Sequence, residues 1–423
     1  MASMNILLIN HYAGSLQHGM EYRPYYLARE WVRLGHRVRV LASSSSHIRA
    51  RAPELNGRSR LDETIDGIDY TWFDTPAYSG NGLARIRNMG AFLLHLFRAA
   101  RKLALSFAPD VVIASSTYPL DIFPAHRIAR LAGARLLYEV HDLWPLSPIE
   151  LGGHSRWHPF ILLLQAAENH ACRHADAIVS ILPKVRPHLE AHGMAPHKLH
   201  IIPNGADPAE WLAGAPDLAT ELGAQLAALR SQGKFIVGYS GTHGLANALD
   251  TLLGAARLMR GAPVVFVLVG DGPEKGHLRR QARYLDLDNV LFCAPVEKRQ
   301  IPALLGCFDL AYIGWQHQPL YRFGISPNKL IDYMMAALPI LHAVDAGNDP
   351  VADADCGLTV APGDPRSVAR GVEALLALAP AERVAMGLRG KHYALSNLSY
   401  PVLGRRFLRA CVDQADLQEH HHG

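Results

Sequence analysis

The sequence predicts an α/β protein built from two doubly wound, Rossmann-like domains that face each other across a deep cleft. Three observations support this prediction. Short apolar runs alternate with helical stretches along the whole chain, which is typical of parallel sheets covered by helices on both faces. A cluster of turn-forming residues at 203–208 interrupts both patterns, and a second series of strands follows it. The length of 423 residues also suits two domains.

The first series of elements predicts an N-terminal domain over residues 1–205. Its seven strands are expected at 5–10, 37–42, 70–74, 110–115, 135–141, 177–181 and 200–203. Its helices are expected at 22–34, 83–107, 124–131 and 158–173. Six or seven strands are enough for one complete doubly wound sheet.

The second series predicts a C-terminal domain over residues 206–396. Its strands are expected at 235–240, 264–269, 290–293, 310–313, 340–344 and 358–360. Its helices are expected at 246–259, 275–285, 302–307 and 328–337. A last helix within 397–416 has no strand after it, so it either caps its own domain or packs back on the first one.

Composition narrows the class of protein. Hydrophobic residues make up 49% of the chain and charged residues 19%, which excludes a disordered or fibrous protein. No apolar run approaches the ~20 residues of a membrane-spanning helix. The N-terminus has no basic segment before its apolar stretch, so we interpret residues 4–10 as a strand and not as a signal peptide.

Cysteine and histidine usage predicts a cytoplasmic protein without a structural metal. The five cysteines are far apart and form no Cys-x-x-Cys pair, which favours reduced, mostly buried thiols. The histidines at 420–422 are typical of an added tail and are left out of the search for ligands. Residues 1–200 hold 22 Lys and Arg against 16 Asp and Glu, so this half is expected to attract an anionic surface or acceptor.

Ligands of such sheets bind beyond the carboxyl ends of the strands, so we searched the loops that follow strands. Residues 10–19 contain Gly14 and Gly19 and open a helix, whose N-terminal N–H groups suit a diphosphate or a sugar. A plain loop with two turn glycines is the alternative. His141 and Asp142 end another strand and could orient a hydroxyl or transfer a proton, or they could simply cap the next helix.

In the second half, Tyr239-Ser240-Gly241-Thr242-His243-Gly244 and Val269-Gly270-Asp271-Gly272 each end a strand. Glycines there would let an anion or a flat base approach the backbone, although structural turns explain them equally well.

The strongest segment is 322–334. Ser326 and Pro327 are typical of an N-cap followed by a proline at the first helical position. Lys329 then lies in the first turn, where its charge opposes the helix dipole until an anion binds. Asp332 is three residues further on and shares the same helix face. One face therefore offers a cation for a phosphate and a carboxylate for ribose hydroxyls.

Together these motifs resemble the family-4 retaining glycosyltransferases of the two-domain GT-B type. The evidence is the first loop with its glycines, His141-Asp142-Leu143-Trp144-Pro145, Pro203-Asn204-Gly205, Gly270-Asp271-Gly272-Pro273, and Ser326-Pro327-Asn328-Lys329-Leu330 followed by Asp332-Tyr333-Met334. The resemblance covers residues 4–415 and is greatest for the branch of N-acetylfucosamine (L-fucosamine) transferases of bacterial surface polysaccharide synthesis.

The resemblance implies that a UDP-sugar binds the C-terminal domain and that a glycan or a polyprenyl-diphosphate-linked sugar binds the N-terminal one. It implies catalytic roles for His141, Asp142 and Lys329, with His141 near the donor sugar. The implied donor-binding residues are His18, Gly19, Gly241, Thr242, His243, Asp271, Gly272, Gly324, Ser326, Asn328, Lys329 and Asp332. Among these, Asp271 and Gly272 would lie near the nucleobase, Lys329 on the phosphates and Asp332 on the ribose.

Two positions depart from the family pattern. Gly324 stands where the family usually has a Glu that contacts sugar hydroxyls, which suggests a deoxy or amino sugar as the donor. The Arg and Lys that usually follow the first strand of the second domain are replaced near Thr242 and Asn247. Lys329, with or without Arg322, and backbone N–H groups must then neutralise the diphosphate.

The chemistry expected is charge stabilisation of a departing nucleoside diphosphate. The sequence shows no pair of free carboxylates for a double displacement, which favours a same-face mechanism in which the departing phosphate helps to take the acceptor's proton. No Asp-x-Asp motif stands in a loop after a strand, so we expect no metal and no other cofactor.

Residues 83–107 form a basic amphipathic stretch that could lie on the inner face of an anionic cytoplasmic membrane, or could simply pack on its own sheet. No nucleic-acid partner is expected. Two alternatives to transfer stay open: a sugar-nucleotide 2-epimerase on the same scaffold, and a nucleotide-sugar-binding subunit with weak or no catalysis.

Overall fold

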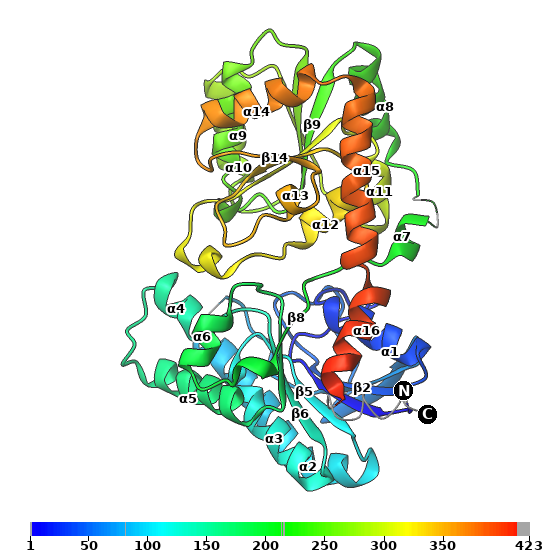
Figure 1. Cartoon of the computed structure of the whole chain (residues 1–423), viewed down its shortest axis with the longest axis vertical. Coiled ribbons are helices and arrows are strands. Elements are labelled where there is room, and N and C mark those ends of the chain that lie inside the picture. Colours follow the sequence, from blue (N-terminus) through cyan, green and yellow to red (C-terminus); the bar gives the residue numbers. More distant parts are fainter. Residues whose placement is uncertain (1, 81, 213, 215, 413–423) are drawn as a thin grey trace. The chain divides into compact units, whose positions relative to one another are not determined.

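The computed structural model describes residues 2–80, 82–212, 214 and 216–412. The chain divides into two compact units (Figure 1). Unit 1 runs from the N-terminus to Asn204 and includes the chain from Tyr400 on, and unit 2 is Gly205–Ser399. The sequence analysis placed this boundary at 205/206. The predicted class, two α/β domains with parallel sheets, is confirmed.

Unit 1 contains an eight-stranded sheet in the order β3-β4-β2-β1-β5-β6-β7-β8. The strands are β1 (Asn5–Ile9), β2 (Arg37–Ser43), β3 (Arg60–Ile65), β4 (Ile68–Phe73), β5 (Val111–Ala114), β6 (Arg135–Val140), β7 (Ala177–Ser180) and β8 (Leu199–Ile201). All neighbours are parallel except β3 and β4. The strands of the centre are apolar because helices cover both faces of the sheet.

The helices of unit 1 connect these strands. They are α1 (Arg23–Arg33), α2 (Leu83–Ser106), α3 (Ile122–Ala132), α4 (Leu146–Glu150), α5 (Pro159–His174), α6 (Arg186–Ala191) and α16 (Tyr400–Cys411). Helix α16 packs on α1, where Tyr400 stacks on Tyr26 and Trp31 donates a hydrogen bond to the Gly404 carbonyl. The last helix was expected within residues 397–416. Residue 397 instead ends α15 (Pro380–Asn397), and residues 413–416 lie outside the described residues.

Unit 2 contains a six-stranded parallel sheet in the order β11-β10-β9-β12-β13-β14. The strands are β9 (Phe235–Ser240), β10 (Val264–Val269), β11 (Val290–Cys293), β12 (Leu310–Gly314), β13 (Ile340–Ala343) and β14 (Gly357–Thr359). This is the 3-2-1-4-5-6 order of a doubly wound dinucleotide-binding fold, whose switch point lies between β9 and β12.

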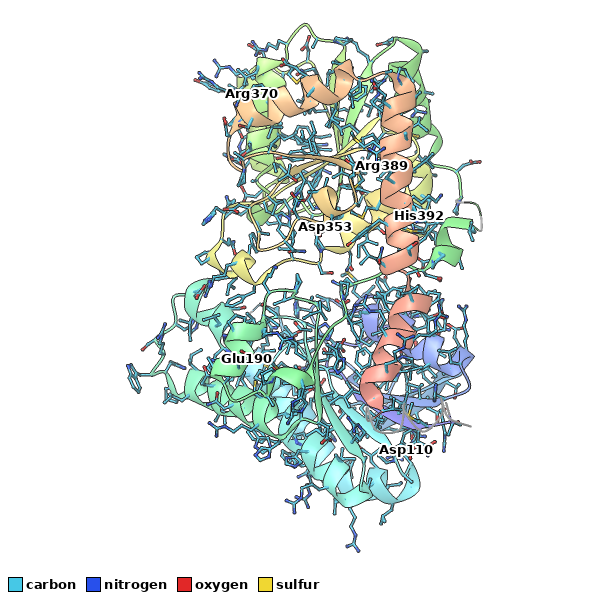
Figure 2. The ribbon with its side chains drawn as sticks, viewed as in Figure 1. Asp110, Glu190, Asp353, Arg370, Arg389 and His392 are labelled. Atoms are coloured by element: carbon cyan, nitrogen blue, oxygen red, sulfur yellow. The ribbon has the colours of Figure 1, made fainter. Side chains whose placement is uncertain are left out.

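The helices of unit 2 cover both faces of this sheet (Figure 1). They are α7 (Pro208–Leu212), α8 (Thr220–Ser231), α9 (Leu249–Leu258), α10 (Lys275–Tyr284), α11 (Ile301–Leu305), α12 (Asn328–Met335), α13 (Pro350–Asp353), α14 (Pro365–Ala377) and α15 (Pro380–Asn397). Separate apolar cores lie on the two faces. The charged residues labelled on α14 and α15 in Figure 2, Arg370, Arg389 and His392, are exposed on the outside.

The five cysteines are free, and Cys172, Cys293, Cys356 and Cys411 are buried, as predicted. Among the residues described, no helix is both long enough and apolar enough to cross a bilayer.

Candidate functional site

A pocket of about 320 Å³ lies in unit 2 at the carboxyl end of β9, next to the switch point of the sheet. It is lined by Ser240, Gly241, Thr242, Asn247, Ile301, Leu305, Lys329, Asp332 and Tyr333. Four of these, Gly241, Thr242, Lys329 and Asp332, are residues that the sequence analysis predicted. The pocket therefore joins the loop after β9 to the first turns of α12.

Lys329 provides the positive charge of the pocket. Its Nζ donates hydrogen bonds to the Tyr239 hydroxyl at 2.7 Å and to Asn247 Oδ1 at 3.2 Å, and it lies 4.0 Å from the centre of the Tyr239 ring. Burial lowers the pKa of Lys329 to about 7, an effect that the Asp332 carboxylate partly opposes. The hydrogen-bond partners of the ammonium are thus neutral, and a bound anion would stabilise its charged form.

Asp332 is the acidic residue of the pocket lining. Burial raises the pKa of Asp332 to about 7, while the nearby Lys298 and Lys329 favour the ionised carboxylate. The next residue, Tyr333, is buried, and its hydroxyl accepts a hydrogen bond from the Ser240 N–H at 3.0 Å. Helix α12 is therefore attached directly to the end of β9.

The loop after β9 approaches Lys329 closely because Gly241 has no side chain. Gly241 has φ +144°, and a Cβ on it would lie 2.8 Å from Lys329 Cε and 3.0 Å from Nζ. The Thr242 carbonyl accepts hydrogen bonds from Tyr239 and Asn247, which are the two residues that also hold the lysine. Glycine is thus needed at 241 for the lysine to reach its observed place.

His243, also predicted as a donor-binding residue, lies outside the pocket lining. Its side chain is buried, and neither ring nitrogen has a hydrogen-bond partner within the described part of the chain. Burial, together with the nearby Lys275, lowers the pKa of His243 to about 4, so the ring is neutral. Its backbone N–H donates to the Asp271 carbonyl at 2.8 Å, which ties the two strand-end loops together.

Asp271 and Gly272 also lie outside the pocket lining. Asp271 is exposed and accepts a hydrogen bond from the Gly272 N–H at 2.9 Å. A Cβ on Gly270 would lie 1.9 Å from the Gly241 carbonyl oxygen, so this glycine permits the two loops to pack together. The loops after β9 and β10 are therefore in direct contact. The nucleobase role of Asp271 stays a prediction.

The predicted N-cap of α12 is wrong by one residue. Pro327, with φ −78° and ψ 131°, is the N-cap, and the helix begins at Asn328. The loop that leads into Pro327 is held by the Asn348 side chain. This side chain accepts a hydrogen bond from the Ile325 N–H and donates one to the Ile325 carbonyl. Ser326 is therefore in the entering loop, Asn328 is exposed at the first helical position, and Lys329 remains in the first turn.

Gly324 ends a short 3₁₀ helix (Pro319–Phe323) with φ +90°. This conformation disfavours any residue with a side chain. Position 324 therefore has no side chain that could contact a ligand, and Gly324, Ser326 and Asn328 lie outside the pocket lining.

In unit 1, His141 belongs to a buried network at the ends of β5 and β6. Its Nε2 lies 3.0 Å from Ser115 Oγ and 3.3 Å from Glu139 Oε2. The Ser115 hydroxyl donates its proton to Glu139 at 2.6 Å, so His141 Nε2–H must be the donor to Ser115. A ring that carries its proton on Nε2 alone has its lone pair on Nδ1, and 14% of the His141 side chain is exposed.

Glu139 is the centre of this network and is only 1% exposed. Arg23, the first residue of α1, donates from Nε to Glu139 Oε1 at 2.9 Å and from Nη2 to the Ile202 carbonyl at 2.8 Å. Although burial opposes ionisation, Arg23, His141 and Ser115 hold the pKa of Glu139 down at about 2. A fixed negative charge therefore orients His141. The sequence analysis missed both Glu139 and Arg23.

Asp142 is occupied by the turn that leads into α4. Its Oδ1 accepts hydrogen bonds from the Leu143 N–H at 2.8 Å and the Ser147 hydroxyl at 2.7 Å, and its Oδ2 accepts from the Trp144 indole at 3.3 Å. The expected alternative was that Asp142 caps the next helix, but the N-cap of α4 is Pro145, and Asp142 instead binds the turn before it.

His18 and Gly19 close the loop after β1 against the chain near β3. His18 Nε2 lies 2.9 Å from Glu63 Oε1, and its Nδ1 lies 2.9 Å from the Arg51 carbonyl. A Cβ on Gly19, which has φ +90°, would lie 2.7 Å from Ala50 Cβ. Both residues are thus fixed within unit 1 by packing that the sequence did not predict.

Helix α2 buries only part of its predicted apolar side in unit 1. Phe92, Leu96 and Leu103 are buried, whereas Leu83 is 79%, Ile86 39% and Phe97 38% exposed. The helix therefore packs on its own domain along one stripe and leaves apolar residues exposed in its first turn and its middle.

Comparison with known proteins assigns both halves. Residues 18–205 match the family described as "Glycosyl transferase 4-like domain", and residues 234–378 match "Glycosyl transferases group 1". The chain is 26% identical over 295 residues to the putative colanic acid biosynthesis glycosyl transferase WcaI of Escherichia coli K12, covering 66% of this chain and 69% of that protein.

Solved structures share the fold at lower identity. Anabaena Alr3699/HepE, crystallised with UDP, matches with a TM-score of 0.67 at 15% identity over 96% of this chain and 99% of that one. A structure described as trehalose-6-phosphate from E. coli bound with UDP-2-fluoro glucose matches with a TM-score of 0.71 at 13% identity, covering 96% and 98%.

Proposed function

Because its two domains belong to the glycosyl transferase 4-like and glycosyl transferase group 1 families, the chain is a glycosyltransferase, and we propose that it is a retaining enzyme that uses a UDP-sugar. The acceptor would be a glycan or a polyprenyl-diphosphate-linked sugar of bacterial polysaccharide synthesis, in the cytoplasm. WcaI, the relative at 26% identity, is named for the biosynthesis of such a polysaccharide.

The observation that carries this proposal is the placement of Lys329 and Asp332 on one helix in the pocket after β9. When the bond between the sugar C1 and the diphosphate oxygen breaks, negative charge collects on the diphosphate. Lys329, the N-terminus of α12 and the backbone N–H groups of the loop at 241–242 can stabilise that charge. Asp332 can accept hydrogen bonds from the two ribose hydroxyls.

The same-face step follows from this charge distribution. The acceptor oxygen forms its bond to C1 on the face that the diphosphate leaves, and the acceptor's proton passes to an oxygen of the departing phosphate. His141, oriented by Glu139 through the network in unit 1, would accept a hydrogen bond from the sugar at Nδ1. Because Lys329 supplies the cation, we propose that added Mg²⁺ or Mn²⁺ leaves the turnover unchanged.

The donor sugar is proposed to be a deoxy or N-acetylamino sugar, N-acetylfucosamine being one candidate. Supporting this, position 324 is a glycine held at φ +90°, so it provides no carboxylate for a sugar hydroxyl.

A panel of UDP-sugars in deuterated water, with and without a lipid-linked N-acetylglucosamine analogue, tests the proposal. NMR of the product is expected to show transfer or slow hydrolysis with the α configuration kept at C1. Deuterium at C2 would instead identify an epimerase. Tight binding of every UDP-sugar without turnover would identify a binding subunit, and an inverted product would contradict retention.

We also propose that unit 1 rests on an anionic membrane through the first turn of α2, where exposed Leu83 and Ile86 lie near the exposed Arg87. Co-sedimentation with phosphatidylglycerol vesicles is expected to fall when Leu83 and Ile86 are both changed to Gln. The control is Leu105→Gln, which removes an exposed leucine near the other end of α2. Equal sedimentation of the two variants and the wild type would contradict the proposal.

A further inference from the structure

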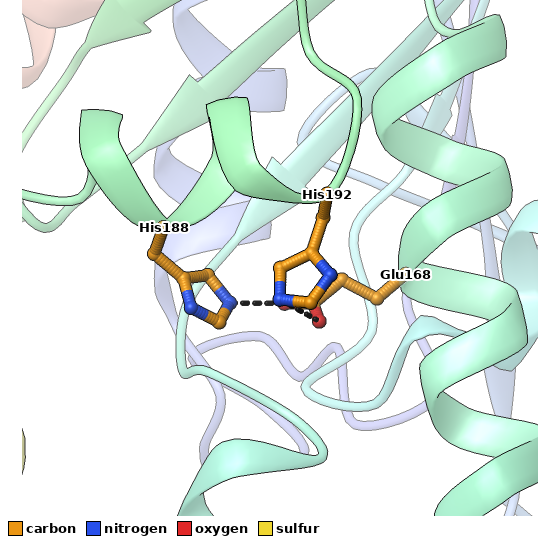
Figure 3. A group of neighbouring side chains, drawn as sticks. All are labelled: Glu168, His188 and His192. Carbon is orange, nitrogen blue, oxygen red and sulfur yellow. Dashed lines mark hydrogen bonds and ion pairs between the residues drawn. The ribbon is translucent and has the colours of Figure 1, made fainter.

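Three potential metal ligands converge in unit 1 between helices α5 and α6 (Figure 3). Glu168 projects from the middle of α5, His188 from α6, and His192 from the residue that caps α6. One ligand atom of each lies within 4.8 Å of the other two. The Glu168 side chain is 2% exposed, against 10% for His188 and 25% for His192, so the group opens to solvent on the side of His192.

Two amide side chains hold the His192 ring beside the carboxylate. His192 Nδ1 lies 2.8 Å from Asn169 Oδ1 and 3.0 Å from Gln165 Nε2, so it donates to the first or accepts from the second. Gln165 Nε2 also lies 3.0 Å from Asn169 Oδ1 and 2.8 Å from Glu168 Oε2. In this orientation Nε2 of His192 faces Glu168 Oε2 at 3.8 Å, too far for a hydrogen bond.

The spacing of the three ligand atoms is close to that of a metal site. A zinc ion bound about 2.0–2.1 Å from each ligand atom would place neighbouring ligands roughly 3.3–3.8 Å apart. His188 Nε2 lies 2.7 Å from Glu168 Oε1, so it would need to move outward by less than about 1 Å. Two imidazoles spaced four residues apart and one carboxylate are a known zinc donor set.

We propose that Glu168, His188 and His192 bind one divalent transition-metal ion of the zinc class, a site separate from the donor pocket of unit 2. The ion would bind Nε2 of both imidazoles and the carboxylate. The proton that His188 now shares with Glu168 would move to His188 Nδ1, so both rings stay neutral. Asn169 and Gln165 would hold His192 in its ligating orientation. The ion would fasten α6 to α5 and keep one position open to water.

Cobalt binding tests this site in the full-length protein, with His420, His421 and His422 each replaced by Gln so that they cannot bind the ion. One equivalent of Co²⁺ is expected to give the visible absorption of a tetrahedral site, and Zn²⁺ should displace it. His192→Gln should weaken binding roughly 10–100-fold or more. The matched control is His170→Gln, also on α5, where His170 contacts His126 and not Glu168.

Two results would overturn the proposal: no tetrahedral spectrum at one equivalent, or a spectrum that His170→Gln removes and His192→Gln leaves intact. Circular dichroism shows whether each variant is folded. A measurement without variants covers the case in which His192→Gln does not fold. Zn²⁺ is expected to protect His188 and His192 from modification by diethylpyrocarbonate, as mapped by peptide mass spectrometry, and unchanged modification of both would also count against the site.

Discussion

At the residue scale, the proposed donor site depends on Lys329. Its ammonium is partly buried, and it is held by the Tyr239 hydroxyl and the Asn247 amide oxygen, which are both neutral. Burial brings its pKa to about 7, so near neutral pH the charged and uncharged forms coexist. A diphosphate bound there would favour the charged form strongly.

This environment predicts that UDP binding takes up a proton above neutral pH. At pH 8 the free lysine is mostly uncharged, whereas the lysine bound to a diphosphate must be charged, so nearly one proton should enter with UDP. UDP affinity should therefore fall as the pH rises above about 7. Calorimetry at pH 8 in two buffers of different ionisation enthalpy measures the uptake. The diphosphate itself, with a last pKa near 6, contributes little at pH 8.

Lys329→Ala is the control for this experiment and should abolish the uptake. An uptake that persists in the variant would mean that another group, such as Asp332, takes the proton.

The sequence predicted that residues lie close together where spacing along one helix was enough. Lys329 and Asp332 share a helix face, so their proximity followed from helical periodicity alone. Tyr239 contacts Lys329 over 90 positions, and Arg23 contacts Glu139 over 116, and no local pattern reports such pairs. One signal was available: Glu139 stands inside the apolar run Leu136–Val140, and a buried carboxylate requires a charged partner.

At the scale of elements, the loop after β9 packs directly against the first turn of α12. The Gly241 Cα lies so close to Lys329 that a methyl group would displace the lysine. Gly241→Ala is therefore expected to weaken UDP binding roughly 10-fold, because the alanine adds strain at φ +144° and pushes Nζ from its place. Isothermal calorimetry with UDP measures the change.

The matched control is Gly244→Ala in the same loop. Its added Cβ would meet only ordinary contacts, the nearest being Thr242 Cγ2 at 3.7 Å, and its φ of −114° suits alanine. This variant should bind UDP as the wild type does. Similar losses in both variants would indicate a general loosening of the loop, and no loss in Gly241→Ala would show that the lysine position is unimportant.

Most strands were predictable because both faces of the two sheets are covered, which requires apolar runs. The exception is β3, whose sequence Arg60–Ile65 is polar. It pairs antiparallel with β4 at the edge of the sheet, and Asp66-Gly67, both at positive φ, form the two-residue connection. Asp-Gly between two strands is a strong signal for a hairpin, and it could have identified β3. The cap of α12 was misplaced because Asn348, distant in sequence, holds the entering loop.

At the scale of the whole molecule, we propose different tasks for the two units. Unit 2 would hold the nucleotide through Lys329 and Asp332, and unit 1 would supply His141 for the reacting sugar. His141→Ala is therefore expected to lower kcat by roughly 100-fold or more while UDP affinity stays unchanged. Steady-state kinetics and UDP calorimetry on the same variant measure both quantities.

His197→Ala serves as the control, because His197 is an exposed residue of unit 1 outside the Arg23–Glu139–His141 network. It should keep both kcat and UDP affinity. A His141→Ala enzyme with normal turnover would remove unit 1's histidine from the mechanism.

We propose above all that the pocket after β9 binds the donor diphosphate through Lys329. The most direct measurement is the affinity for UDP of the wild type, Lys329→Ala and Lys234→Ala, the last removing a lysine just before β9, at the opposite end of that strand. We predict a loss of about 10–100-fold for Lys329→Ala, as expected when a hydrogen bond to a charged group worth about 1.5–3 kcal/mol is removed, and no change for Lys234→Ala. Equal affinities for all three proteins would contradict the claim.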